Sequence, residues 1–199
     1  MTFHYEGEDL IVRKREVGDM ENNTYVLECP VTHNSLVIDA CWEPDQIIEL
    51  AGGTSPVAVV QTHGHFDHVQ ALADLVERLG IPVWAHPRDD YPVPIDRKLA
   101  DGDVLVFGNR QAKVIHTPGH TPGGVCLLAG RHLISGDTLF PGGPGNTRGD
   151  AELFAEVIDS VENKLLTLPD DTVVYPGHGL DTTIGAERPH LQEWKDRGW

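Results

Sequence analysis

The chain has 199 residues, 40% of them hydrophobic, so it can bury a substantial core as one domain or at most two small ones. Its formal net charge of −16 repels nucleic-acid phosphates and anionic lipid, which makes both poor candidate partners. Residues 1–20 contain no apolar signal-peptide segment and no later stretch approaches the roughly 18 apolar residues of a membrane helix, so we expect a soluble, cytoplasmic protein without membrane partners.

The first half of the chain alternates short apolar runs with Gly, Asn, Pro and His, which predicts an antiparallel sheet followed by mixed strands and helices. In chain order, we expect strands at 10–17, 23–29 and 35–40, a helix at 43–52, a strand at 56–62, a helix at 68–80 closed by Gly80, and a strand at 81–87.

The second half returns to short strands at 103–107, 112–117, 124–130 and 131–137, then a helix at 149–168 with Asp150 as its N-cap, and a last strand at 172–179. There is no tandem repeat and no linker long enough to mark a boundary, so we expect a single domain spanning 1–199. The most irregular segment is the Pro/Gly-rich loop 139–150, a kind of loop that tends to carry function.

Three cysteines, Cys29, Cys41 and Cys126, are widely spaced and form no CxxC pair. An odd number with this spacing argues against a disulfide framework or a structural zinc knuckle. We expect them to be small buried side chains in a reducing compartment.

The densest functional motif is "HGHFDH", at 63–68, directly after the apolar strand "PVAVVQT". Alternate residues of an extended segment point the same way, so His63 and His65 can reach one metal ion together. Asp67 and His68 follow after the chain turns into a helix, so they should serve a second, neighbouring ion. Imidazole and carboxylate donors suit zinc, iron, manganese or cobalt.

Three further polar residues stand at strand ends, each beside small turn residues: His120 in "HTPGHTPGG", Asp137 in "ISGDTLF" and His178 in "VYPGHG". A carboxylate buried at the end of a strand, as expected for Asp137, is costly unless a cation compensates it. Singly, each residue could cap a turn or lie on the surface. Together, in this order after the first cluster, they indicate a metal site.

"THGHFDH", "PGHTPGG", "SGDTLF" and "YPGHG" together resemble the metallo-β-lactamase superfamily, and within it the short glyoxalase II-like branch of hydroxyacylglutathione hydrolases. The resemblance covers nearly the whole chain. It implies an α/β fold, a four-layer αββα sandwich with the site at one edge between the sheets. It also implies ligand roles: His63, His65 and His120 on a first metal, Asp67, His68 and His178 on a second, and Asp137 bridging both.

Two divalent ions, zinc before iron or manganese, would share a bridging hydroxide at neutral pH, with Asp67 also placed to orient the attacking water or take its proton. A thiolester of a low-molecular-weight thiol is a suitable small-molecule substrate, because a thiolate leaving group with a pKa near about 8.5 departs without a strong acid. We therefore expect a binuclear thiolester hydrolase. The sequence contains no serine nucleophile elbow or Cys/His motif for covalent catalysis.

The chain departs from the glyoxalase II pattern on the substrate side. Only 21 residues follow His178, which leaves no separate C-terminal substrate-binding domain in this chain. In the loop after Asp137, "GPGN" puts Asn146 where the branch commonly has a Lys or Arg, and Arg148 lies two residues on and could supply the cationic anchor. Asn146 and Arg148 are thus the candidate substrate-binding residues.

Two other reaction classes remain open. Persulfide dioxygenases are similar to this chain in motif but use one iron held by two histidines and a carboxylate, which here would be His63, His120 and Asp137. The loop Arg and Asp typical of those relatives are not matched by "GNTR". A lactonase or another metallo-hydrolase is the third alternative.

Overall fold

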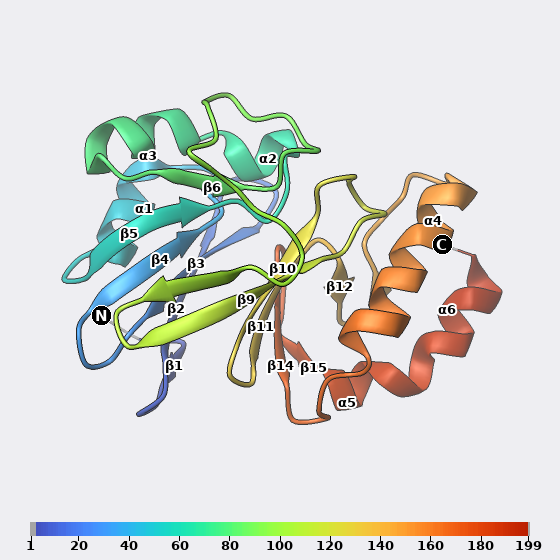
Figure 1. The fold of residues 1–199 in the computed structure, drawn as a ribbon. Coiled ribbons are helices and arrows are strands. Elements are labelled where there is room, and N and C mark those ends of the chain that lie inside the picture. Colours follow the sequence, from blue (N-terminus) through green and yellow to red (C-terminus); the bar gives the residue numbers. More distant parts are fainter. Residues whose placement is uncertain (1–2, 199) are drawn as a thin grey trace.

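The computed structural model describes residues 3–198 and contains two large β-sheets flanked by helices (Figure 1). The first sheet has seven strands, in spatial order β1 (Tyr5–Glu6), β2 (Ile11–Val17), β3 (Asn22–Glu28), β4 (Asn34–Ile38), β5 (Ser55–Val60), β6 (Val83–Ala85) and β7 (Arg97–Lys98). Pairing is antiparallel from β1 to β4 and parallel from β4 to β7. The expected antiparallel start is therefore confirmed, and the sheet continues as a parallel one.

The second sheet has six strands, in the order β15 (Thr182–Thr183), β14 (Val173–Pro176), β11 (His132–Gly136), β10 (Val125–Ala129), β9 (Arg110–His116) and β8 (Val104–Phe107). Its pairs are antiparallel except β11 with β14, which run parallel. A separate two-stranded ribbon, β12 (Leu139–Phe140) and β13 (Gly143–Pro144), follows β11.

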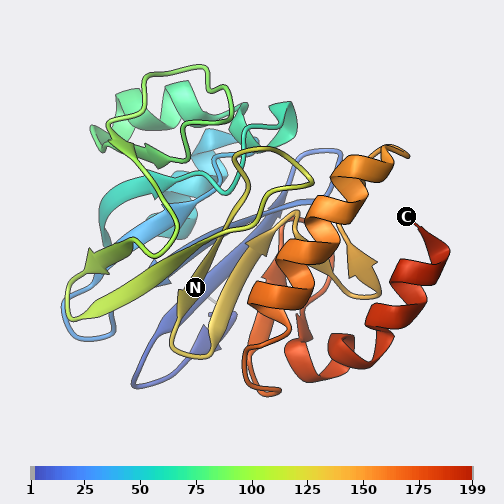
Figure 2. The same cartoon turned by 45° about the vertical axis from the view of Figure 1, so that its right-hand side comes forward.

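The helices lie on the outer faces of the two sheets (Figures 1 and 2). One side carries α1 (Pro44–Ala51), α2 (Phe66–Val69) and α3 (Leu72–Leu79). The other carries α4 (Ala151–Ser160), a π-helical turn (Val161–Leu165), α5 (Ile184–Glu187), a 3₁₀ turn (Arg188–His190) and α6 (Leu191–Arg197).

Three apolar clusters fill the spaces between these layers. Alternate residues of a strand face opposite sides. On β3, Tyr25 and Leu27 therefore enter the cluster between the sheets, while Val26 enters the cluster under α1 and α3. On β11, Ile134 faces the other sheet and Leu133 faces α4 and α6. Three clusters separate four layers, which confirms the αββα sandwich.

Two predicted helices are not continuous α-helices in the structure. The helix expected at 68–80 is divided into α2 and α3, because the Ala71 backbone N–H donates to the carbonyls of Ala40 and Cys41 (3.0 and 3.1 Å) instead of continuing one helix. The helix expected at 149–168 begins as predicted, with Asp150 Oδ1 accepting from the backbone N–H of Glu152 and Leu153. It then widens into the π-helical turn at Val161–Leu165.

All three cysteines are buried and unpaired, as expected for small core side chains. Within residues 3–198, no helix combines the length and apolarity needed to span a bilayer.

Candidate metal centre

The candidate residues lie where strands of both sheets end. The segment carrying His63 and His65 leaves β5, His120 follows β9, Asp137 comes directly after β11, and His178 follows β14. Strands β9, β11 and β14 all run in one direction, since β10 is antiparallel to both of its neighbours and β14 is parallel to β11. Their carboxyl ends therefore meet at one edge, next to α2.

The first group consists of His63, His65 and His120, whose ligand atoms lie within 4.8 Å of one another. The ring centroids are 4.9 Å apart for His63 and His65, 4.6 Å for His65 and His120, and 5.1 Å for His63 and His120. Three imidazoles at this spacing can hold one metal ion.

The second group consists of Asp67, His68 and His178, which also fall within 4.8 Å. Asp67 Oδ2 lies 3.4 Å from His178 Nε2 and 3.7 Å from His68 Nε2, and the two Nε2 atoms are 3.2 Å apart. This set combines two imidazoles with one carboxylate, and it too can hold an ion.

Asp137 lies between the two groups. Its Oδ2 is 3.4 Å from His120 Nε2 of the first group and 3.6 Å from His178 Nε2 of the second, and its Oδ1 is 3.5 Å from His68 Nε2. One carboxylate therefore faces both groups at once.

Unsatisfied polar atoms point to the same place. His63 Nε2, His120 Nε2 and Asp137 Oδ1 are buried and make no hydrogen bond to the residues that the structure describes. Buried groups without partners cost free energy, and a bound cation would compensate all three. Burial lowers the pKa of His63 and of His120, so both rings are neutral at pH 7 and offer a nitrogen lone pair. The donor set thus fits divalent metal ions.

The far nitrogen of each of four histidines is tied down by an oxygen. His120 Nδ1 lies 2.9 Å from the Asn146 carbonyl and His178 Nδ1 lies 2.8 Å from the Met20 carbonyl. A carbonyl can only accept, so each Nδ1 carries the proton and each Nε2 is left for a metal. His63 and His68 are held in the same way by the residues described next.

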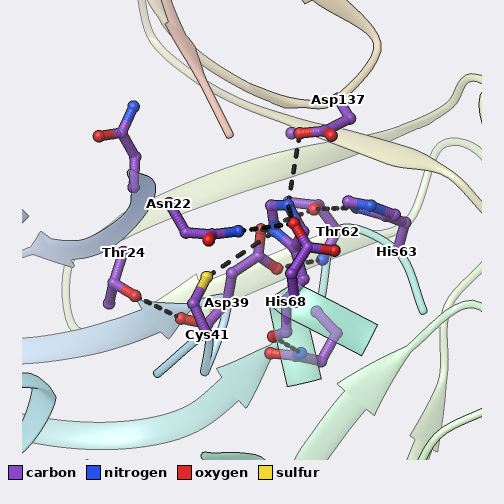
Figure 3. Close-up of polar contacts among 12 residues, drawn as sticks. Asn22, Thr24, Asp39, Cys41, Thr62, His63, His68 and Asp137 are labelled. Carbon is purple, nitrogen blue, oxygen red and sulfur yellow. Dashed lines mark hydrogen bonds and ion pairs between the residues drawn. The ribbon is translucent and has the colours of Figure 1, made fainter. Parts of the chain in front are cut away.

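Asp39, which the motif analysis did not select, organises the floor of the site (Figure 3). Its Oδ2 lies 3.1 Å from His68 Nδ1 and accepts a 2.7 Å bond from Thr62 Oγ1, while its Oδ1 accepts from the Thr62 backbone N–H. Thr62 Oγ1 in turn lies 3.1 Å from His63 Nδ1. One buried carboxylate therefore orients a histidine of each group. Carboxylate–histidine pairs of this kind fix the tautomer and raise ligand basicity.

Asn22 is a second residue that sequence spacing did not reveal. It is buried at the start of β3, and its Nδ2 donates to Asp67 Oδ2 at 2.9 Å, while its Oδ1 accepts from Trp42 Nε1 at 3.2 Å. Burial raises the pKa of Asp67, but hydrogen bonds from His178 and Asn22 outweigh it and hold the pKa below its ordinary value. Asp67 is therefore ionised at neutral pH and can serve as a metal ligand.

A cavity of about 490 Å³ opens onto these groups. Its floor includes His120, Asp137 and His178, and one wall is the ribbon formed by β12 and β13, with Phe140, Pro141 and Pro144. Such a volume, lined by apolar side chains with a few polar groups, suits a small molecule.

The two predicted substrate-binding residues are both near the centre but lie differently. Asn146 lines the cavity, and its backbone carbonyl holds His120. Arg148 is exposed and lines a smaller neighbouring hollow of about 150 Å³ beside His65 and His120. Arg197 of α6 also lines the main cavity, although no motif in the tail of the sequence indicates it.

The model of the metallo-β-lactamase superfamily matches residues 17–178, a span that contains both groups and Asp137. The chain belongs to this superfamily. The expected resemblance is therefore confirmed for fold and family, and the His/Asp groups of this metallo-β-lactamase-type centre are able to hold metal.

Three similar proteins show how far this likeness extends. Hydroxyacylglutathione hydrolase GloC of Haemophilus influenzae is 32% identical over 182 residues, covering 78% of this chain and 84% of GloC. The structure of ETHE1 from Myxococcus xanthus matches with a TM-score of 0.81 at 29% identity, covering 91% of this chain and 83% of ETHE1. TTHA1623, solved in a di-iron-bound form, matches with a TM-score of 0.73 at 34% identity, covering 88% of this chain and 96% of TTHA1623.

Proposed function

We propose that this chain is a metal-dependent hydrolase that cleaves a thiolester of a low-molecular-weight thiol at a centre of two divalent ions. The observation that carries the proposal is the position of Asp137. Its Oδ2 faces His120 Nε2 of the first group and His178 Nε2 of the second, and its Oδ1 faces His68 Nε2. A carboxylate so placed is suited to bridge two ions. The first ion would be held by His63, His65 and His120, and the second by Asp67, His68 and His178.

Two such ions, when bound, would supply Lewis acidity that lowers the pKa of a water molecule and polarises a substrate carbonyl. Asp67 Oδ2, held by Asn22 Nδ2, is the carboxylate that would orient the attacking water or take its proton. The β12–β13 ribbon, with Phe140 against His178 at a ring distance of 6.4 Å, would exclude bulk water from one side of the cavity.

A thiolester fits this centre because its leaving group needs little help. A thiolate with a pKa near about 8.5 departs without a strong general acid. Among the described residues, those that line the cavity include no Lys, Tyr or Glu that could act as one. The likeness to GloC, a hydroxyacylglutathione hydrolase, supports the same substrate class.

Asn146 and Arg148 remain the proposed substrate-binding residues, and we add Arg197 because it lines the same cavity as Asn146. Asn146 and Arg197 line the cavity together with His120, Asp137 and His178, whereas Arg148 lies at the adjoining hollow. A carboxylate on the substrate would find its cation at one of the two arginines.

Zinc is our first choice of metal, with iron or manganese as alternatives, because imidazole and carboxylate donors without thiolate accept all three. The di-iron-bound form of TTHA1623 supports a two-ion centre. Three free, buried thiols support a reducing cytoplasmic location. We also propose that the chain acts as one domain, since the family match spans residues 17–178.

A persulfide dioxygenase is the second candidate. The similarity between the motifs of that class and those of this chain favours it, as does the structural match to ETHE1. Its single iron would be held by His63, His120 and Asp137. Asp67, His68 and His178 would then have no metal to bind, although they form a group as compact as the first. We prefer the binuclear hydrolase because Asp137 lies between the two groups and because "GNTR" lacks the loop Arg and Asp typical of the dioxygenases.

Metal analysis of the purified protein beside two assays separates the candidates. Two ions per chain with hydrolysis of a lactoyl thiolester would support the hydrolase. One iron per chain with persulfide-dependent oxygen uptake would select the dioxygenase. Hydrolysis of lactones but not of thiolesters would overturn the substrate class while leaving the hydrolase intact.

A further inference from the structure

The carboxylate of Asp89 accepts three hydrogen bonds from two distant segments. Its Oδ2 accepts from the Gly64 backbone N–H at 2.9 Å and from Thr121 Oγ1 at 2.7 Å, and its Oδ1 accepts from the Gly123 backbone N–H at 2.7 Å. Asp89 itself lies in the connection between β6 and β7, outside any helix or strand. Three donors on one ionised carboxylate make a strong, directional clasp.

The donors share one property, which is that each lies close in sequence to a histidine of the first group. Gly64 stands between His63 and His65, Thr121 directly follows His120, and Gly123 comes two residues later. The segments 61–65 and 117–124 carry no helix or strand that could fix their spacing. Near the ends of the two segments that adjoin the sheets, the Val125 backbone N–H donates to the Thr62 carbonyl. Farther from the sheets, the Asp89 carboxylate connects the same two segments by accepting from Gly64 and Thr121.

The two glycines show how closely the clasp is packed. A Cβ atom on Gly64 would lie 2.8 Å from Asp89 Cβ and 2.6 Å from the Asp90 carbonyl oxygen, and a Cβ on Gly123 would lie 2.7 Å from Asp89 Cγ. Real Cβ contacts are not this short, so the carboxylate can reach both backbones only because these positions are glycine.

The side chains of the second group have hydrogen-bond partners outside this clasp. Asp67 is held by Asn22, His68 by Asp39 and His178 by the Met20 carbonyl. The hydrogen bonds of the Asp89 side chain go to Gly64, Thr121 and Gly123. A change at Asp89 should therefore act on one group and spare the other.

We propose that Asp89 is a positioning residue that sets the spacing between His63 and His65 on one segment and His120 on the other, and so determines the affinity of the first ion. The inference rests on the proposed two-ion centre. It assigns Asp89 no contact with substrate or metal.

The test is a metal titration of chelator-stripped D89N. Asparagine keeps the size of the side chain but replaces one acceptor oxygen with a donor, so at least one bond of the clasp is lost. We expect the binding constant of one ion to fall roughly tenfold or more, the scale typical of residues that orient ligands, while the other stays within error of the wild type. Cobalt(II) absorption and metal content per chain provide the readout.

D96N is the matched control. Asp96 lies in the same connection and its Oδ2 accepts from the Val83 backbone N–H at 2.8 Å, so D96N also removes a side-chain acceptor from a backbone donor. That bond touches neither segment of the first group. D96N should bind both ions like the wild type, and the melting temperatures of the two metal-free variants should be similar.

A second pair of variants keeps the test decisive if D89N folds poorly. T121V removes only the hydroxyl that donates to Asp89, and T121S retains it. T121V should weaken the same ion as D89N, and T121S should restore its affinity. Unchanged binding of both ions in D89N, or equal weakening of both with a matching loss of metal-free stability, would overturn the inference. A wild type that takes up no divalent ion would instead overturn the proposed function.

Discussion

His63, His65 and His120 come from two irregular segments, whereas Asp67 and His68 lie on α2 beside His178. The segments of the first group donate three hydrogen bonds to the Asp89 carboxylate, whereas the second group is held by α2, by the buried Asn22 side chain in β3 and by the Met20 carbonyl in the loop before it. Ligands of similar chemistry are thus supported by different means. We therefore expect that one half of the centre can be loosened without the other.

The largest expected effect comes from D137A, which removes the one side chain that both groups share. Its loss takes a carboxylate from each group at once, so metal content should fall for both ions. Turnover should fall by more than about a hundredfold, beyond the range typical of residues that only orient ligands. Metal content and thiolester hydrolysis measured on the same preparation test this. Two retained ions with normal turnover would contradict the shared role of Asp137.

A smaller effect on both groups is expected from D39N. An amide has one acceptor oxygen, so it cannot accept from the Thr62 backbone N–H on one side and from His68 Nδ1 and Thr62 Oγ1 on the other, and we expect His68 and His63 to lose their orientation together. We expect roughly 10- to 100-fold weaker binding of both ions, measured by competition with a chelator of known affinity. The control is D45N, which makes the same change at Asp45, an exposed carboxylate that pairs with Arg78. Weakening of a single ion would show that Asp39 does not link the two groups.

N22A should sharpen the comparison from the other side. Asn22 Nδ2 holds Asp67, and nothing in its hydrogen bonds touches the first group. We expect about tenfold weaker binding of one ion only, and combining N22A with D89N should weaken both ions additively. N163A changes an exposed asparagine on the π-helical turn and should leave both ions unaffected.

The smallest effect should come from the arginines, which lie outside both groups. R197Q should raise the KM for a thiolester that carries a carboxylate by less than about tenfold, because a partly exposed ion pair contributes at most about 1 kcal/mol. It should leave kcat and the KM for a neutral thiolester unchanged. R148Q is compared directly with R197Q. A larger rise in KM for R148Q than for R197Q would identify Arg148 as the cation that binds the substrate carboxylate.

Much of the fold follows from patterns visible in the sequence. Alternating apolar residues predict the long strands, and Asp150 marks the start of α4 correctly. The break between α2 and α3 could not be predicted, since it depends on carbonyls of Ala40 and Cys41, which lie about thirty residues earlier. The two-residue strands β1, β7, β12, β13 and β15 are too short to show any period, and the tail helices α5 and α6 lack a distinct apolar pattern.

In the site, four of the seven candidate ligands stand out because "HGHFDH" combines rare residue types at short spacing, whereas His120, Asp137 and His178 were predicted from their turn motifs and the family resemblance. Asp39, Asn22 and Asp89 were not. Each is a single polar residue whose partners are many positions away, so its role exists only after both sheets have folded. Arg197 reaches the cavity because Trp194, buried on α6, fixes that helix against α4 and the second sheet.

The candidate ligands follow strands of both sheets, so any metal ion held there would act on folding as well as on chemistry. A bound ion would cross-link the two halves of the sandwich, with His63 joined to one sheet and His120 and Asp137 to the other. Ions that bind only the native chain stabilise it by mass action, by about 2.7 kcal/mol at a free concentration one hundred times Kd. The temperature of thermal unfolding should therefore follow the supply of divalent cations.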